Sequence, residues 1–148
     1  APARRLRHGP VRRPLRPDRR AQRTGRRDAG SEIFAALAPA AGEHVVKKHR
    51  YSGFFATGLD LILREWGIDT VAITGTTTEN CCHATARDAM FRNYKVAFLS
   101  DATGTFDYPD VGQGAMPAEA VHKATLTILA FSTAHVMTSE EFVARIDR

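Results

Sequence analysis

The strongest constraint on the fold of this chain is a β-branched run that leads directly into a glycine and then a helical pattern. Residues 70–74 read Thr-Val-Ala-Ile-Thr, and Gly75 follows at once. Beyond the glycine, small apolar groups recur at helical spacing at Cys82, Ala86 and Ala89. Such a pattern predicts a short buried strand, a tight turn and a helix.

The rest of the chain repeats this alternation of strand and helix. Apolar runs predict strands at 45–50, 70–74, 95–100 and 134–137, and helical periodicity predicts helices at 32–38, 54–67, 78–93, 118–133 and from 139 onward. Strands separated by helices form a parallel sheet that is covered on both faces, so we expect an α/β fold of three layers. The Gly- and Asp-rich stretch 102–114 is long for a connector and predicts a lid or a pocket wall.

Charge divides the chain into two parts. The net charge is +5, but residues 1–30 contain 11 arginines and two aspartates, which leaves a net charge of −4 on the remainder. Residues 1–29 also contain few apolar side chains, so we expect a disordered Arg/Pro-rich segment followed by one globular domain over 30–148. The basic segment is open to two interpretations, an arm that binds nucleic acid or a tail without a function of its own. The acidic body argues against a polyanionic partner.

The two cysteines and the hydropathy pattern bear on the compartment. Cys81 and Cys82 are adjacent, so they cannot form a long-range disulfide, and a bridge between neighbours is strained. No stretch approaches the roughly 20 apolar residues that cross a bilayer, and the N-terminal residues have no apolar secretion signal. We therefore expect a cytoplasmic protein without a membrane partner.

Cys81 is the candidate nucleophile. It falls in the first turn of the helix predicted after Gly75, where free N–H groups and the helix dipole favour an anion. A thiolate also needs a nearby cation, and Lys47 and Lys48 lie at the end of the strand predicted beside residues 70–74. We expect Cys82 to face the core and His83 to point away from Cys81, because two helical positions separate them by about 200°.

Two segments resemble a known family. Residues 75–89 (GTTTENCCHATARDA) and 48–55 (KHRYSGFF) are similar to the signatures of the isochorismatase-like cysteine hydrolases. This family includes nicotinamidases, N-carbamoylsarcosine amidases, and biuret and ureidoacrylate hydrolases. The resemblance selects Lys48 over Lys47 as the catalytic lysine and implies a non-proline cis peptide at Thr76-Thr77, whose N–H groups would hold the substrate oxygen.

The resemblance also implies parts that this sequence does not visibly contain. Related hydrolases have six parallel strands and a catalytic aspartate after the first of them, and neither Asp18 nor Asp28 follows an apolar strand. We therefore expect an N-terminal part that is truncated or replaced. Tyr51, Phe54 and Phe55 are candidates for the wall of the substrate pocket, with core packing equally open. The scattered histidines have no ligand spacing, so we expect no metal and no cofactor.

The leading functional prediction is a cysteine hydrolase of small amide, ureide or carbamoyl compounds that works through a thioester on Cys81. One alternative is an inactive family member, truncated or frame-shifted, that lacks the catalytic aspartate. The other is a nucleic-acid-binding protein that uses its basic N-terminal arm. A sheet lacking its first strands would expose Val45, Val46, Ile73 and Phe98 in part, so we also expect a homo-oligomer.

Overall fold

The computed structural model describes residues 33–146. The chain divides into two compact units between Glu43 and His44, and 33–43 is the described part of the first unit. It holds one 3-10 turn, η2 (Ala35–Leu37), with no buried residue. The α-helix predicted over 32–38 is therefore wrong for these residues, because no apolar face is packed there. The predictions for residues 1–29, including the domain boundary, lie outside the described residues.

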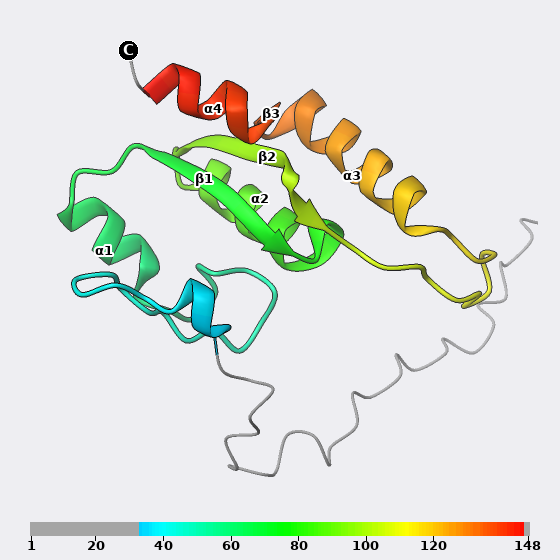
Figure 1. Ribbon diagram of the computed structural model, residues 1–148, viewed down its shortest axis with the longest axis horizontal. Helices are drawn as coiled ribbons and strands as arrows, with labels where there is room; N and C mark the ends of the chain where they lie inside the picture. Colours follow the sequence, from blue (N-terminus) through cyan, green and yellow to red (C-terminus); the bar gives the residue numbers. More distant parts are fainter. Residues whose placement is uncertain (1–32, 147–148) are drawn as a thin grey trace, which may run out of the picture. The chain divides into compact units, whose positions relative to one another are not determined.

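The second unit is built on a parallel sheet (Figure 1). Strand β1 (Thr70–Thr76) pairs with β2 (Lys95–Gly104), and β2 pairs with the short β3 (His135–Met137). Ile73 lies opposite Phe98, and the register shifts between Ile73 and Gly75. β2 continues to Gly104, beyond the predicted end at residue 100. The α/β class with a parallel sheet is thus confirmed.

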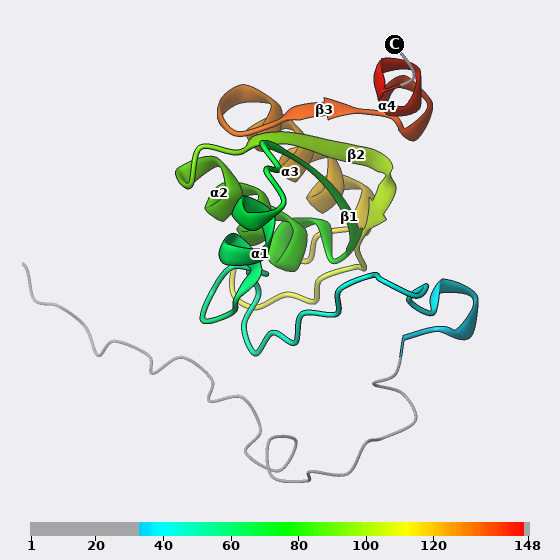
Figure 2. The same ribbon diagram turned by 90° about the vertical axis from the view of Figure 1, so that its left-hand side faces the viewer.

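Helices lie on both faces of this sheet (Figure 2). In chain order they are α1 (Leu59–Glu65), the π-helical turn η3 (Thr78–Cys82), α2 (His83–Phe91), α3 (Ala118–Ser132) and α4 (Ser139–Ile146). Side chains of α1, α2 and α3 pack on one face of the strands, and Phe142 of α4 packs on the other. None of the helices in the described part is long and apolar enough to cross a membrane.

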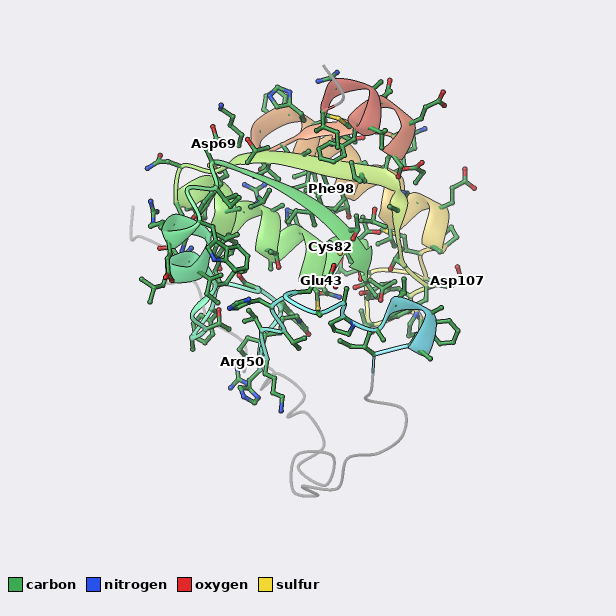
Figure 3. All side chains as sticks on the ribbon, turned by 60° about the vertical axis from the view of Figure 1, so that its left-hand side comes forward. Glu43, Arg50, Asp69, Cys82, Phe98 and Asp107 are labelled. Carbon is green, nitrogen blue, oxygen red and sulfur yellow. The ribbon has the colours of Figure 1, made fainter. Side chains whose placement is uncertain are left out.

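The alternation of side chains along β2 separates the two cores. Val96 and Phe98 face the larger core, which also contains Cys82, whereas Ala97 and Leu99 face the smaller one. Phe98 and Cys82 are labelled in Figure 3. Phe98 has no exposed surface and Ile73 is buried, so the prediction that both would be partly exposed is wrong. Side chains of α2 and α3 cover them from the same side.

Residues 45–50 are not a strand. The described sheet has three strands, not the four predicted, and the chain from His44 to Arg50 is irregular and mostly exposed. A strand needs a neighbour to pair its backbone N–H and C=O groups, and these residues have no strand partner in the described region. The segment instead places Lys48 next to Cys81, just before α2, as described below.

Helix α1 is also shorter than the predicted 54–67. Residues 54–58 form turns in which Ala56 has a positive φ of 53° and the Thr57 hydroxyl accepts the Leu59 N–H at 3.3 Å. At the other end Gly67 has φ 67°, and the Ile68 N–H donates to the Leu63 carbonyl at 2.9 Å. A glycine in this conformation closes the helix, as its sequence position predicts.

Candidate active site

The candidate nucleophile lies where the carboxyl end of β1 turns into α2. The peptide bond between Thr76 and Thr77 is cis, and the π-helical turn η3 follows it. Cys81 is half-buried in this turn, and the Cys82 N–H donates to the Thr77 carbonyl at 3.2 Å. π-Helical turns in proteins occur frequently at functional sites. The turn replaces the regular α-helical start that the sequence predicts from residue 78.

Lys48 reaches Cys81 across 33 positions of sequence. Its Nζ lies 3.4 Å from the Cys81 Sγ and donates to the Arg50 carbonyl at 3.1 Å. The ammonium is therefore held by two acceptors, one of which is the candidate nucleophile. Lys47 is exposed and makes no side-chain hydrogen bond within the described residues. An ammonium at this distance stabilises the negative charge of a thiolate.

Both side chains line one open cavity of about 270 Å³ at the end of β1. Its wall consists of Lys48, the second half of β1, the turn η3 and the start of α2. The residues that line it are Lys48, Ala72, Ile73, Thr74, Gly75, Thr76, Cys81, Cys82 and Thr85. Thr76 lines this cavity and Thr77 does not. The only titratable side chains in the wall are Lys48 and the two cysteines, so the described part of the chain places no carboxylate in it.

The two cysteines differ in environment. Cys82 is only 4% exposed, and its Sγ lies 3.6 Å from the Thr74 carbonyl. Burial, together with the negative charges of Cys81 and Glu79, raises the pKa of the Cys82 thiol to about 11. Cys82 is therefore protonated at neutral pH and packs as a small apolar group, as its position in the sequence predicts.

His83 is turned toward its own helix. Arg87 Nε donates to His83 Nε2 at 3.1 Å, so this nitrogen is an acceptor. Burial and then the Arg87 charge lower the pKa of His83. The half-buried ring makes no hydrogen bond to Cys81 within the described residues, so it is not a partner for the nucleophile.

A second histidine, His122, is hydrogen-bonded to η3, the turn that contains Cys81 and that we call the nucleophile turn. His122 Nε2 lies 3.2 Å from the Ser100 carbonyl, which can only accept, so Nε2 carries the proton. The Nδ1 atom then accepts from the hydroxyl of Thr78 at 2.9 Å. Thr78 is fully buried at the first position of η3. These two hydrogen bonds connect the nucleophile turn to α3 and β2. The spacing of the histidines in the sequence did not predict them.

Glu79 joins the nucleophile turn to the loop after β2. Its Oε1 accepts from the Tyr108 hydroxyl at 2.6 Å and from the Asn80 side chain at 2.9 Å. The buried Oε2 has no hydrogen-bond partner among the described residues. Burial acts to raise the pKa of Glu79, but the hydroxyls of Tyr108, Thr105 and Thr77 outweigh it and lower the pKa to about 2. Glu79 is therefore ionised at neutral pH.

The loop itself is ordered by short-range contacts. The backbones of Tyr108 and Met116 exchange two hydrogen bonds, of 2.8 and 3.0 Å, and the Phe106 ring stacks on Tyr108. The Asp107 carboxylate accepts the Ala118 N–H at the start of α3. The length and composition of residues 102–114 predicted a lid or a pocket wall. Spacing in the sequence did not reveal the hydrogen bond between Glu79 and Tyr108.

The three predicted aromatic pocket residues do not line the cavity that holds Cys81. Tyr51 and Phe55 are largely exposed. Phe54 is buried against Tyr94, with 5.8 Å between ring centroids, and lines a neighbouring apolar cavity with Leu59 and Leu63 of α1. For Phe54 the structure shows core packing, the interpretation that the sequence left open.

No group of three or more His, Cys, Asp or Glu side chains in residues 33–146 is arranged to hold a metal ion. Asp18 and Asp28, the N-terminal aspartates considered from the sequence, lie outside the described residues. The arrangement that remains is a thiol paired with an ammonium, at the carboxyl end of a parallel strand and the start of a helix. In an α/β protein this arrangement is a candidate site for cysteine-based nucleophilic chemistry.

Comparison with known proteins gives this class a family. The sequence pattern of the isochorismatase domain matches residues 4–141. A cysteine hydrolase from Pseudomonas syringae pv. phaseolicola 1448A has a similar structure, with a TM-score of 0.80 and 44% sequence identity over 82% of this chain and 57% of that chain. The chain belongs to the isochorismatase family.

Two curated relatives carry names of specific activities. The ureidoacrylate amidohydrolase RutB of Serratia proteamaculans is 41% identical over 88 residues, which is 60% of this chain and 36% of that protein. Nicotinamidase 3 of Arabidopsis thaliana is 34% identical over 99 residues, or 67% of this chain and 44% of that protein. The chain thus spans less than half the length of these two relatives.

Proposed function

We propose that this chain is a cysteine hydrolase that cleaves a C–N bond in small amide, ureide or carbamoyl compounds. The observation that carries the proposal is the 3.4 Å contact between Lys48 Nζ and Cys81 Sγ in an open cavity. The names of the amidohydrolase and nicotinamidase relatives agree with this class of substrate.

The reaction would proceed in two steps. The Cys81 thiolate attacks the carbonyl carbon, a C–S bond forms, and the C–N bond breaks to release ammonia or an amine, which takes up the proton that the thiol has lost. Water then attacks the thioester, which releases the acid and returns the proton to the thiol. Lys48 stabilises the thiolate, and the turn at Thr76 and Thr77 supplies backbone donors for the oxyanion.

The proton transfers are the point on which the alternative of an inactive family member depends. The described cavity wall offers no carboxylate as general acid or base, and loss of such a group typically lowers rates by about 10²- to 10⁴-fold. An inactive chain would keep the thiol–ammonium pair and fail to turn over. The second alternative, nucleic-acid binding, depends on residues 1–30, which the described residues do not include.

Ammonia release from a panel of nicotinamide, ureidoacrylate, biuret and N-carbamoylsarcosine tests the proposal. Wild-type protein should release ammonia from at least one compound, and Cys81→Ala should abolish the release while Cys82→Ala retains most of it. Mass spectrometry of rapidly quenched protein should find the acyl group on Cys81. Absence of both turnover and acylation across the panel would favour the inactive alternative, and acylation without turnover would locate the defect in the hydrolysis step.

A further inference from the structure

The side chain of Thr85 contacts both parts of the candidate site at once. Thr85 lies in α2, one turn after the nucleophile, and its hydroxyl donates to the Cys81 carbonyl at 2.6 Å. The same oxygen accepts the backbone N–H of Gly53 at 3.0 Å. One hydroxyl therefore connects the nucleophile turn with the segment that carries Lys48.

The first of these bonds is ordinary for a helix, and the second is not. Threonine and serine hydroxyls often donate to the carbonyl four residues earlier, and Thr125, Thr127 and Ser132 all do so in α3. None of these three accepts a backbone N–H from another segment within the described residues. Thr85 does, from a glycine 32 positions earlier.

Gly53 lies close enough to α2 for this bond to define its position. A Cβ atom on Gly53 would come within 3.5 Å of the Thr85 methyl group and 3.4 Å of Leu59. The next residue in the sequence, Phe54, packs its side chain in the core. The backbone of the segment is thus held at two adjacent residues, by the Phe54 ring and by the Thr85 hydroxyl.

Apart from Cys81, the Lys48 ammonium has one hydrogen-bond acceptor within the described residues, the Arg50 carbonyl of its own segment. Lys48 is exposed, it lies outside any strand or helix, and a long flexible side chain loses rotamer entropy when it is fixed. An exposed ion pair of this kind contributes little when its geometry is loose. Lys48 therefore stays near Cys81 only as far as the segment from Lys48 to Gly53 is fixed against α2, and Thr85 makes the hydrogen bond that fixes it.

We propose that Thr85 is a positioning residue, which acts through Lys48 by holding its segment against the turn that carries Cys81. The inference deepens the proposed function, because the pair that it positions is the proposed catalytic pair. It concerns the reactivity of the thiol before any substrate is bound, so it can be tested without turnover.

The test measures alkylation of Cys81 by iodoacetamide at pH 7, with peptide mapping. Thr85→Val keeps the shape of the side chain and removes the hydroxyl, so the alkylation rate should fall about tenfold because the ammonium is no longer held beside the sulfur. Thr85→Ser restores the hydroxyl and should restore the rate. Thr125→Val removes the corresponding helix bond in α3 and should change nothing.

A combination with Lys48→Met establishes the route. If Thr85 acts through Lys48, Thr85→Val should add no further loss in the Lys48→Met protein. Additive losses, or an unchanged rate in Thr85→Val alone, would overturn the inference. Circular dichroism and thermal melting of each variant separate a lost contact from a lost fold. Failure of wild-type turnover, with these alkylation results intact, would reject the proposed function and leave the role of Thr85 standing.

Discussion

The Tyr108 hydroxyl donates a hydrogen bond of 2.6 Å to the Glu79 carboxylate, although 29 positions separate the two residues. Glu79 lies two residues before Cys81, and Tyr108 lies in the loop between β2 and α3. Because the acceptor is ionised, this is one of the stronger kinds of hydrogen bond in a protein. It makes the loop and the nucleophile turn parts of one arrangement, so a change in either should be felt in the other.

Acid should remove the contribution of Glu79 to stability. The pKa of Glu79 is lowered to about 2 in the folded protein, from an ordinary value of 4.5. A lowered pKa stabilises the folded state fully above the ordinary value, and the contribution is lost as the pH falls from about 4.5 toward 2. Urea unfolding between pH 3 and pH 6 should therefore give a shallower pH dependence for Glu79→Gln than for wild type. Glu119→Gln, at the start of α3, is the control, and equal slopes for wild type and Glu79→Gln would contradict this expectation.

Tyr108→Phe should destabilise the fold without disturbing the stack on Phe106. The change removes the hydroxyl that donates to Glu79 and accepts from the Asn80 amide. It leaves a half-buried carboxylate with one fewer donor, a loss of about 1.5 to 3 kcal/mol for a hydrogen bond to a charged group. Chemical denaturation measures the difference. In a Glu79→Gln background the same substitution should cost less, because the two residues share the interaction.

Cys81 should be the only thiol that reacts at neutral pH. Burial raises the pKa of Cys82 to about 11, so its thiolate fraction at pH 7 is negligible. Brief treatment with iodoacetamide followed by peptide mapping should find the label on Cys81. Preferential labelling of Cys82 in native protein would show that the roles of the two sulfurs are reversed.

The α3 helix offers a matched pair of substitutions for the core. Leu129 is fully buried, whereas Phe131, two residues later, is 93% exposed. Leu129→Ala should lower the free energy of unfolding by about 2 to 5 kcal/mol, because it leaves a cavity between α3 and the sheet. Phe131→Ala should change it by less than about 0.5 kcal/mol. A large loss for Phe131→Ala would mean that another molecule covers that face in solution.

Self-association is expected from the edge of the sheet. β1 pairs only with β2 in the described residues, and five of its seven positions are exposed. An exposed strand edge is normally paired with a strand of another molecule or covered by another segment. Light scattering after size-exclusion chromatography should therefore give a mass above that of one chain. A monodisperse monomer at micromolar concentration would show that this edge is protected in another way.

Sequence reasoning located the elements whose pattern is local. The run 70–74 and the small apolar spacing of Cys82, Ala86 and Ala89 were sufficient to place a strand and a helix. The turn predicted at Gly75 is wrong, because Gly75 continues β1 opposite Thr103 and the turn η3 begins only at Thr78. The predicted strand at 45–50 failed because a strand depends on its neighbour, and two valines before a basic run do not reveal whether one is present.

The contacts that hold the candidate site together were harder to foresee. Each of them joins a residue near Cys81 to a side chain or backbone group about 30 to 45 positions away, through Thr85, Glu79 or Thr78. Hydroxyl and carboxylate groups at such positions have many possible partners, and only the folded arrangement selects one. Lys48 was located through the family motif, because the charge pattern alone did not separate it from Lys47.

Ala86 and Ala89 have no exposed surface and belong to the core between α2 and the sheet. Each of these side chains is a single methyl group, so α2 can lie close to the sheet. The two residues therefore set the distance of α2 from β1 and β2. Since η3 leads directly into α2, the same spacing sets the height of the Cys81 sulfur. Enlarging either alanine should move α2, and with it the Cys81 sulfur, away from β1 and β2, so two chemically inert residues would affect the reactivity of the candidate nucleophile from a distance.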